Sequence, residues 1–167
     1  MDYSVTMYLR IKSLMYLKKQ KIAAIDAERI LDKANLSETH MERIRLLVAI
    51  NSFNEERYET ANTQFNKLRG TKALSTTKAL TTAIIAATQV DDFTGALDYF
   101  RVEGSKVRTS SFSILYELAS EQNKVDALNE IANQYAAEYG VSKEQAHSKM
   151  LNLIRAKANL TRIKNRL

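Results

Sequence analysis

Residues 58–65 read YETANTQF and residues 93–100 read FTGALDYF. Each stretch places an aromatic ring three residues before an alanine, Ala61 or Ala96, and a second aromatic ring four residues after it. A weaker copy is centred on Ala27, so the pattern recurs at intervals of roughly 35 residues. A recurrence of this length is typical of stacked helical hairpins, whose usual role is to present a surface to a partner.

The composition favours a soluble helical protein. The chain has 167 residues, of which 45% are apolar and 26% are charged, and no proline interrupts its helices. It contains no cysteine, which excludes disulfides, thiolate metal sites and a cysteine nucleophile. Its longest strongly apolar run, residues 83–87, is far shorter than the roughly 20 residues that span a bilayer, and no secretory signal pattern is visible. We therefore expect a soluble cytoplasmic protein.

Helix ends are marked by glycines and by small hydroxyl residues. Gly70, Gly104 and Gly140 each follow a periodic apolar stretch, as left-handed helix caps do. The hydroxyl residues that open the next segments are Ser37, Ser75, Ser110 and Ser142, the last with Gln145 at capping-box spacing. The predicted helices are 2–19, 22–34, 38–54, 57–69, 75–89, 92–103, 110–121, 124–139 and 143–165.

Short connections between these helices predict antiparallel pairs in one continuous all-α domain, residues 1–167. The predicted hairpins are 2–34, 38–69, 75–103 and 110–139, followed by a C-terminal capping helix at 143–165. An irregular helical bundle with an accidental recurrence is the alternative interpretation.

The recurrent stretches resemble the tetratricopeptide repeat (TPR), whose small residues let neighbouring helices approach closely. The copies match at Val48, Ala49, Tyr58, Ala61 and Phe65, then at Leu80, Ala83, Phe93, Ala96 and Phe100, and more weakly at Ile11, Leu14, Ala24, Ala27, Leu31 and Ala34. Ile84 departs from the pattern, which expects a small residue there. Beyond Gly104 the register stays open between Ala127 with Ile131 and Leu128 with Ile131 and Tyr135.

This resemblance implies a short right-handed solenoid with a concave groove on its first helices. The implied groove residues are Arg43, Leu46, Ile50 and Phe53 in one repeat and Lys78, Thr81, Ile85 and Thr88 in the next. An apolar strip beside Arg43 and Lys78 suits an amphipathic helix or an extended peptide with acidic residues. Alternatively, the apolar members of the strip pack on the preceding hairpin.

Positive charge is concentrated at both ends of the chain, although the net charge is only +6. Residues 1–22 carry five Lys or Arg against one Asp, and residues 143–167 carry seven against one Glu, so the middle of the chain is mildly acidic. We interpret the apolar residues of the first helix as buried, and its terminal lysines as favourable to the helix dipole.

The last predicted helix combines an apolar seam with a basic surface. The seam is Met150, Leu153, Ala156, Leu160, Ile163 and Leu167, and the basic residues are Arg155, Lys157, Arg162, Lys164 and Arg166. A helix that covers the last hairpin explains this pattern. The alternatives are a homodimer through the seam, or a basic face that meets nucleic acid or an anionic membrane.

The sequence contains no recognisable catalytic, cofactor or metal constellation. His40 and His147 are far apart and lack a second ligand at metal-binding spacing, and the glycines form no phosphate-binding loop. We therefore expect a non-catalytic adaptor, scaffold or chaperone-like module that binds a protein segment without a cofactor. The alternative is a nucleic-acid-associated regulator that uses the basic C-terminal helix.

Overall fold

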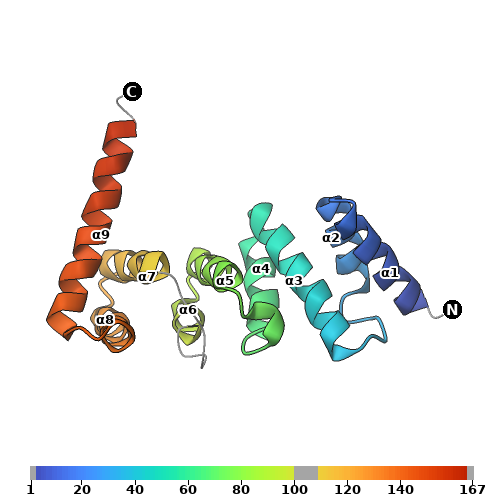
Figure 1. The fold of residues 1–167 in the computed structure, drawn as a ribbon, viewed down its shortest axis with the longest axis horizontal. Coiled ribbons are helices and arrows are strands. Elements are labelled where there is room, and N and C mark those ends of the chain that lie inside the picture. The colour runs from blue at the N-terminus through green and yellow to red at the C-terminus, as the bar shows by residue number, and fades with distance from the viewer. Residues whose placement is uncertain (1–2, 100–108, 165–167) are drawn as a thin grey trace. The chain divides into compact units, whose positions relative to one another are not determined.

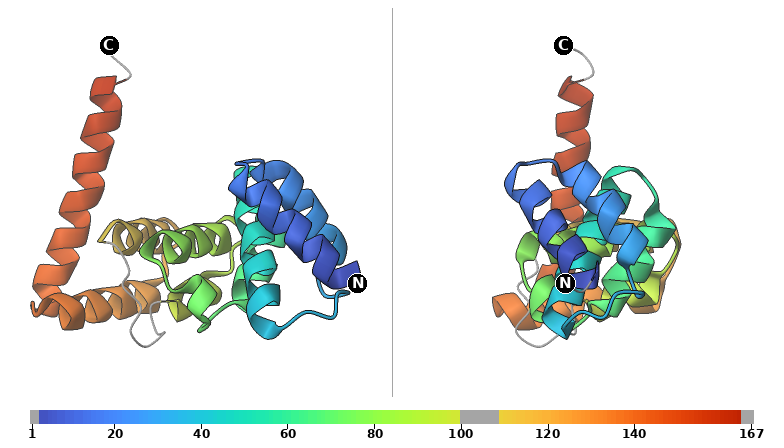
Figure 2. Two further views of the ribbon diagram at one scale, coloured as in Figure 1. Left: turned by 45° about the vertical axis from the view of Figure 1, so that its right-hand side comes forward. Right: turned by 90° about the vertical axis from the view of Figure 1, so that its right-hand side faces the viewer.

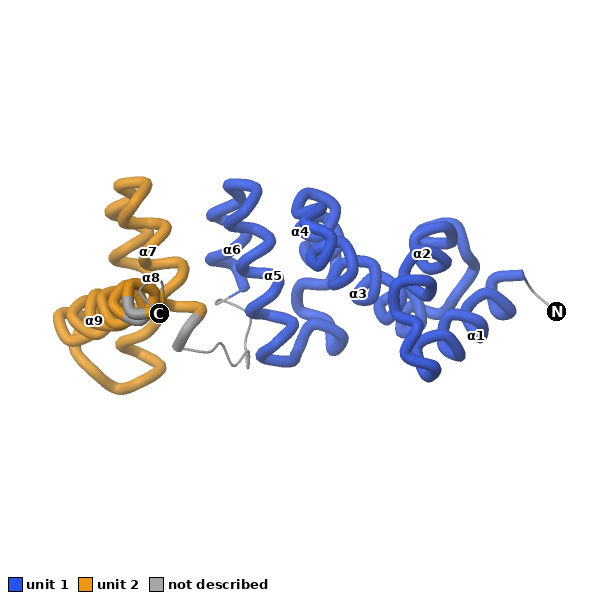
Figure 3. The backbone as a smooth tube through the Cα atoms, turned by 90° about the horizontal axis from the view of Figure 1, so that it is seen from above, with its two compact units in different colours: residues 1–106 blue, residues 107–167 orange. Residues whose placement is uncertain are grey.

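The computed structural model describes residues 3–99 and 109–164, and all regular secondary structure in these ranges is helical (Figure 1). The prediction of an all-α fold is therefore confirmed. The chain divides into two compact units, residues 1–106 and residues 107–167, which Figure 3 colours separately. The expectation of one continuous domain stays a prediction.

Unit 1 contains six α-helices and one short 3₁₀ helix in its described part, and helices that follow each other in sequence pack together (Figure 2). They are α1 (Tyr3–Tyr16), α2 (Gln20–Ile30), α3 (Glu38–Asn54), α4 (Tyr58–Lys67), η1 (Lys72–Leu74), α5 (Thr77–Gln89) and α6 (Phe93–Asp98). In addition, α3 contacts α5 and η1.

Unit 2 contains three helices in its described part, with α9 packed on both of the others. They are α7 (Thr109–Glu121), α8 (Val125–Tyr139) and α9 (Lys143–Lys164). Each predicted helix thus has a counterpart, although the second half of the helix expected at 92–103 lies outside the described residues.

Most of the predicted caps are present. Gly140 closes α8 with a φ of 64°, and Gly70 follows α4 with a φ of 81°. Ser37 caps α3 by accepting a hydrogen bond from the His40 amide at 3.4 Å. Ser142 and Gln145 form the predicted capping box, with reciprocal hydrogen bonds of 3.1 and 2.9 Å.

One cap prediction is wrong, and another falls outside the described residues. Ser75 does not open α5, because Thr76 holds the cap position and its hydroxyl accepts a hydrogen bond from the Ala79 amide at 3.2 Å. The sequence offers three adjacent hydroxyl residues here, and the 3₁₀ turn before Ser75 shifts the helix start. Gly104 lies outside the described residues.

One turn conformation recurs between the helices of four successive pairs. Its key residue adopts the left-handed region in each case: Lys18 (φ 57°), Glu56 (φ 59°), Asp91 (φ 57°) and Asn123 (φ 54°). The next residue donates its amide to a carbonyl five residues earlier, at 2.8, 2.8, 2.9 and 2.8 Å respectively. The interval from one turn to the next becomes shorter along the chain, so the backbone repeats although the sequence period varies.

The turns correct the predicted repeat register. Ala23, Ala61 and Ala96 each donate their amide to the residue that follows the left-handed position, and all three are fully buried. Ala23, and not Ala27, is therefore equivalent to Ala61. In unit 2 the residue with the same hydrogen bond is Leu128, which is therefore the counterpart of Ala96. The two registers left open by the sequence placed Ala127 or Ile131 there, and both are wrong.

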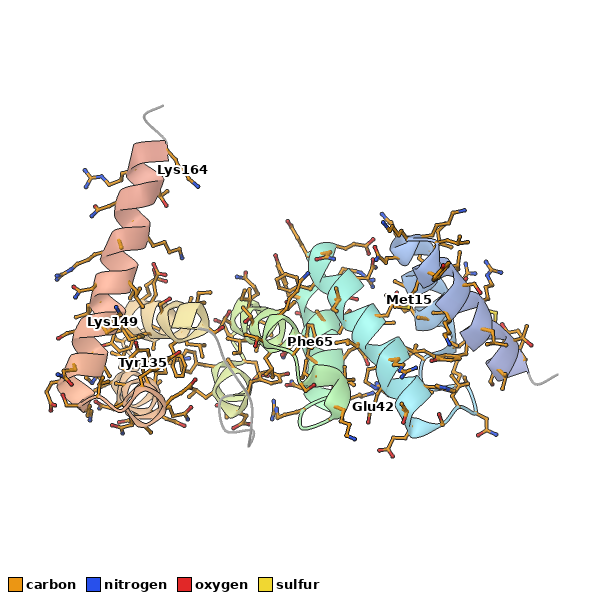
Figure 4. The ribbon with its side chains drawn as sticks, viewed as in Figure 1. Met15, Glu42, Phe65, Tyr135, Lys149 and Lys164 are labelled. Carbon is orange, nitrogen blue, oxygen red and sulfur yellow. The ribbon has the colours of Figure 1, made fainter. Side chains whose placement is uncertain are left out.

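Small residues and aromatic rings form the two cores. In unit 1, Ala49, Ala61 and Phe65 are fully buried, as close packing of α3 and α4 requires (Figure 4 labels Phe65). In unit 2, the ring of Phe112 meets that of Tyr135 edge to face, with centroids 5.4 Å apart.

A polar network centred on Asp92 joins α4 to α6. Its carboxylate accepts hydrogen bonds from Asn62 at 3.0 Å, from Asn66 at 3.2 Å and from the amide of Gly95 at 2.9 Å. Burial raises the pKa of Asp92, but these hydrogen bonds outweigh it and hold the pKa below its ordinary value. The ionised carboxylate is thus part of the folded structure.

The network continues through Tyr99. Its hydroxyl donates to the side chain of Asn66 at 2.9 Å, and the guanidinium of Arg69 lies 4.9 Å from its ring centroid. Burial raises the pKa of Tyr99 to about 12, so the phenol stays protonated as a donor.

Candidate interaction groove

A cavity of about 770 Å³ lies in unit 1 between α1 and α3. Its walls are mainly apolar, and they also include Gln20 of α2 and Lys78 of α5. The apolar residues of its lining are Tyr8, Ile11, Met15, Tyr16, Ile44, Leu46, Leu47 and Ile50. Figure 4 labels Met15 on α1. Because several of these side chains are half-buried or exposed, the cavity opens to solvent.

The cavity includes half of the groove residues predicted from the sequence. Arg43, Leu46 and Ile50 line it from α3, and Lys78 lines it from α5. The structure thus brings together the two cations and two residues of the apolar strip, Leu46 and Ile50, that were expected to act together. This size lies within the range of ordinary ligand pockets, which is roughly 300–1,000 Å³.

The other four predicted residues do not line this cavity. The ring of Phe53 packs edge to face on Tyr58, at 5.6 Å between centroids. Thr88 is buried, and its hydroxyl donates to the carbonyl of Ile85 at 2.7 Å. Ile85 and Thr81 are half-buried in α5. Of the predicted groove residues, the cavity therefore keeps three from α3 and only Lys78 from α5.

Three cations surround the cavity, and no carboxylate of the described chain lines it. Lys12, Arg43 and Lys78 are exposed, and none of them forms an ion pair within residues 3–99 and 109–164. Arg43 instead donates to the hydroxyl of Tyr8 at 3.4 Å, and the Tyr8 ring stacks on His40 at 4.0 Å. The rim is therefore positively charged and keeps its capacity to bind anions.

Sequence reasoning missed the contribution of α1. Tyr8, Lys12 and Met15 line the cavity opposite α3. The turns align the first repeat with the second so that Lys18 is equivalent to Glu56 and Ala23 to Ala61. In the same alignment these three residues are equivalent to the predicted groove residues Leu46, Ile50 and Phe53. Alignment on Ala23 instead of Ala27 would therefore have identified all three.

A second cavity, of about 450 Å³, lies beside the turn between α3 and α4. The cation that lines it, Arg57, is already paired within the fold. Arg57 forms ion pairs with Glu28 at 2.9 Å and with Glu55 at 3.3 Å, and the hydrogen bond to Glu28 raises the pKa of Arg57. We interpret this cluster as structural.

The N-terminal part of the apolar seam predicted on α9 packs within unit 2. Met150 is fully buried and Leu153 half-buried, so Met150 is not available to a second copy of the chain. Ala156 is exposed. The side chains of Leu160 and Ile163, and the whole of Leu167, lie outside the described part.

The basic surface predicted on α9 is exposed where it is described. Arg155, Arg162 and Lys164 point away from the core of unit 2, whereas Lys157 forms an ion pair with Glu117 of α7 at 3.2 Å. Figure 4 labels Lys164 near the end of α9. Arg166 lies outside the described residues.

The two histidines lie in different units and contact tyrosines. His147 Nδ1 is 2.6 Å from the hydroxyl of Tyr116, a contact that joins α9 to α7. Burial raises the pKa of Tyr116. Within the described residues, no group of three or more His, Asp or Glu side chains is placed to hold a metal ion.

No family model matches this chain, and neither the curated proteins nor the solved structures contain a significant match. None of the described helices combines the length and apolar character needed to span a membrane.

Proposed function

We propose that this chain is a non-catalytic protein-interaction module that binds a protein segment in the cavity between α1 and α3. One observation carries the proposal: an open apolar cavity is rimmed by Lys12, Arg43 and Lys78, which have no ion-pair partners in the described chain. Exposed apolar recesses with few convergent polar groups are the usual form of a binding site.

The chemistry of this cavity favours an amphipathic segment with acidic residues. Apolar side chains of the segment would replace water against Met15, Leu46 and Ile50, which supplies most of the affinity. Its carboxylates would then meet the cations at the rim, which fixes its register and speeds association. An acidic amphipathic helix that lays one face in the groove satisfies both requirements.

The proposed architecture is a short right-handed solenoid of antiparallel hairpins that resembles TPR proteins. The recurrent turn at Lys18, Glu56, Asp91 and Asn123 supports it, because the same turn joins the two helices of each of the four pairs, as repeated hairpins require. The burial of Ala146 and Met150 supports α9 as a capping helix of unit 2. Adaptor, scaffold or chaperone-like activity follows from such a surface without a cofactor.

Paired variants at matched positions test the groove. Lys78→Glu reverses a charge at the cavity, and Lys72→Glu reverses another exposed charge, nearby in the sequence, that does not line it. Ile50→Ser removes an apolar wall, and Ile25→Ser removes a similarly exposed isoleucine from α2. Affinity purification from the native host, followed by quantification of each recovered protein, gives the readout.

We expect Lys78→Glu and Ile50→Ser to abolish recovery of the same partner, while the two control variants keep it. Circular dichroism would establish that all four variants fold. Unchanged recovery with both cavity variants would refute the groove as the binding site.

Nucleic-acid binding through α9 is the second candidate, because Arg155, Arg162 and Lys164 are exposed on one helix without ion pairs in the described chain. Such contacts to phosphates give affinity that falls steeply with salt. A salt titration with nonspecific DNA and RNA measures it, and no binding at low ionic strength eliminates this candidate.

A further inference from the structure

The turn between α1 and α2 exposes a continuous run of apolar and basic side chains. Residues 16–22 read YLKKQKI, and we call this run the basic tip. Every one of these residues is exposed, with 89% of Tyr16, 61% of Leu17 and 46% of Ile22 accessible to solvent. Single exposed apolar residues are ordinary on a protein surface, whereas a cluster of large ones marks an interaction site.

The fold does not require this composition. The same turn conformation is built at Glu56, Asp91 and Asn123 from acidic and amide residues. In the second of these turns along the chain, the exposed residues around Glu56 are Asn54, Glu55 and Glu56 itself. Tyrosine, leucine and lysine at the first turn therefore reflect a property of this surface and not of the backbone.

The basic tip is positively charged, and most of that charge is free. Lys18 and Lys19 form no ion pair in the described part of the chain, and Lys21 pairs with Glu55 at 3.3 Å while 75% of its side chain stays exposed. Lys12 lies one helical turn before Tyr16, on the same face of α1. Two copies of this surface would repel each other, so the charge favours an anionic partner over a second copy.

We infer that the basic tip docks this protein on an anionic phospholipid bilayer, at the level of the headgroups. Tyrosine is suited to that interface because its ring is apolar and its hydroxyl is polar. Leu17 and Ile22 enter the acyl boundary, and the lysine side chains extend their ammonium groups to the lipid phosphates.

The shape of the tip favours a bilayer over a protein. A protein partner places its anchor residues in recesses, and only Tyr16 and Gln20 of the tip border a described cavity. A lipid surface needs no recess, since protruding side chains insert into it. The tip adjoins the groove of the proposed function, because Tyr16, Gln20 and the nearby Lys12 also line that cavity. The other five residues of the tip (Leu17, Lys18, Lys19, Lys21 and Ile22) do not line it, and neither Arg43 nor Lys78 belongs to the tip.

Sedimentation with vesicles tests the inference on the full chain. Phosphatidylcholine vesicles with phosphatidylserine should bind the protein, and vesicles of phosphatidylcholine alone should bind it much less. The triple variant Lys18→Glu, Lys19→Glu and Lys21→Glu should lower the partition coefficient at least roughly 100-fold, because each lysine near an anionic surface contributes about 1 kcal/mol. The double variant Tyr16→Ser and Leu17→Ser should lower it roughly tenfold or more.

Matched controls locate the contact. Lys143→Glu, Lys149→Glu and Arg155→Glu together change the net charge by the same amount on exposed positions of α9. Val125→Ser and Val141→Ser remove two exposed apolar side chains of unit 2. Both controls, and the groove variant Lys78→Glu, should bind vesicles as the unmodified chain does.

Three results would overturn the inference. The first is no sedimentation with phosphatidylserine vesicles. The second is equal loss of binding in the α9 control, which would assign the lipid contact to the basic C-terminal helix. The third is loss of a purified protein partner in the tip variants without any vesicle binding, which would make the tip part of a protein interface.

Discussion

The turn between α1 and α2 and the turn between α5 and α6 have the same backbone and opposite surroundings. Lys18 and Asp91 both adopt a φ of 57°, and the amides that follow them donate over 2.8 and 2.9 Å. In the later turn, Asp92 caps α6 and binds two asparagines of α4. In the earlier turn, Lys19 occupies the same position and makes no capping hydrogen bond through its side chain.

This contrast shows that the same backbone turn can have different roles. The side chain directly after the left-handed residue determines whether the turn contacts neighbouring helices or faces solvent. An aspartate at that position turns inward and connects neighbouring helices, whereas a lysine points into solvent and leaves the turn available for contacts. Gly95 belongs to the same arrangement, because a Cβ atom there would collide with the carboxylate of Asp92.

Loss of the Asp92 carboxylate should have the largest effect. Asp92→Ala removes a helix cap and leaves two part-buried asparagines without their acceptor, so we expect a loss of about 3 kcal/mol in the free energy of unfolding. The matched change Lys19→Ala should alter it by less than about 0.5 kcal/mol. Urea unfolding followed by circular dichroism measures both, and equal losses would contradict the contrast.

Acid should remove the contribution of Asp92 selectively. Because the pKa of Asp92 is lowered in the folded protein, its stabilisation is complete above the unfolded pKa of about 4 and is lost as the pH falls through the folded pKa. We expect Asp92→Asn to cost about 1–2 kcal/mol at pH 7, and this difference to shrink below about pH 4. Urea midpoints across that range check it; a pH-independent difference would show that the charge is irrelevant.

An acceptor placed in the first turn should stabilise it. Lys19→Asn supplies the side-chain oxygen that α2 lacks, so we expect a gain of about 1 kcal/mol in the free energy of unfolding. Thermal unfolding measures the gain. Asp92→Asn, in the turn that already has an aspartate, serves as the comparison, and a loss of stability in Lys19→Asn would mean that the two turns are not interchangeable.

Glycine at the left-handed positions should give a small gain in both turns. Lys18→Gly and Asp91→Gly relieve the steric cost of a positive φ and lose some of that gain to backbone entropy, which leaves about 0.5 kcal/mol. Denaturant midpoints of the two variants should shift by similar amounts. Glu59→Gly, within α4, should shift the midpoint in the opposite direction.

The helices were predictable because apolar periodicity and local caps determine them. The bounds of α3 agree with the prediction, and Ser37, Gly140 and the Ser142–Gln145 box act as expected. The recurrent turn was not predictable, since residues as different as lysine, glutamate and asparagine occupy its left-handed position. Such a conformation is usually inferred from glycine, which is absent there.

The cavity was predictable only in part. Arg43, Leu46, Ile50 and Lys78 follow from the repeat pattern, which does not depend on the first helix pair. The α1 side was missed because α2 carries buried alanines on two successive turns, and the pattern alone does not select Ala23 over Ala27.

The interval between recurrent turns shortens by three residues at each step from Lys18 through Glu56 and Asp91 to Asn123. Three residues are close to one turn of an α-helix, which has about 3.6 residues. An insertion or deletion of that size lengthens or shortens a helix while its buried stripe keeps nearly the same direction. A scaffold of this kind can change its span in steps without a redesigned interior. That property gives protein engineers a defined place to extend it.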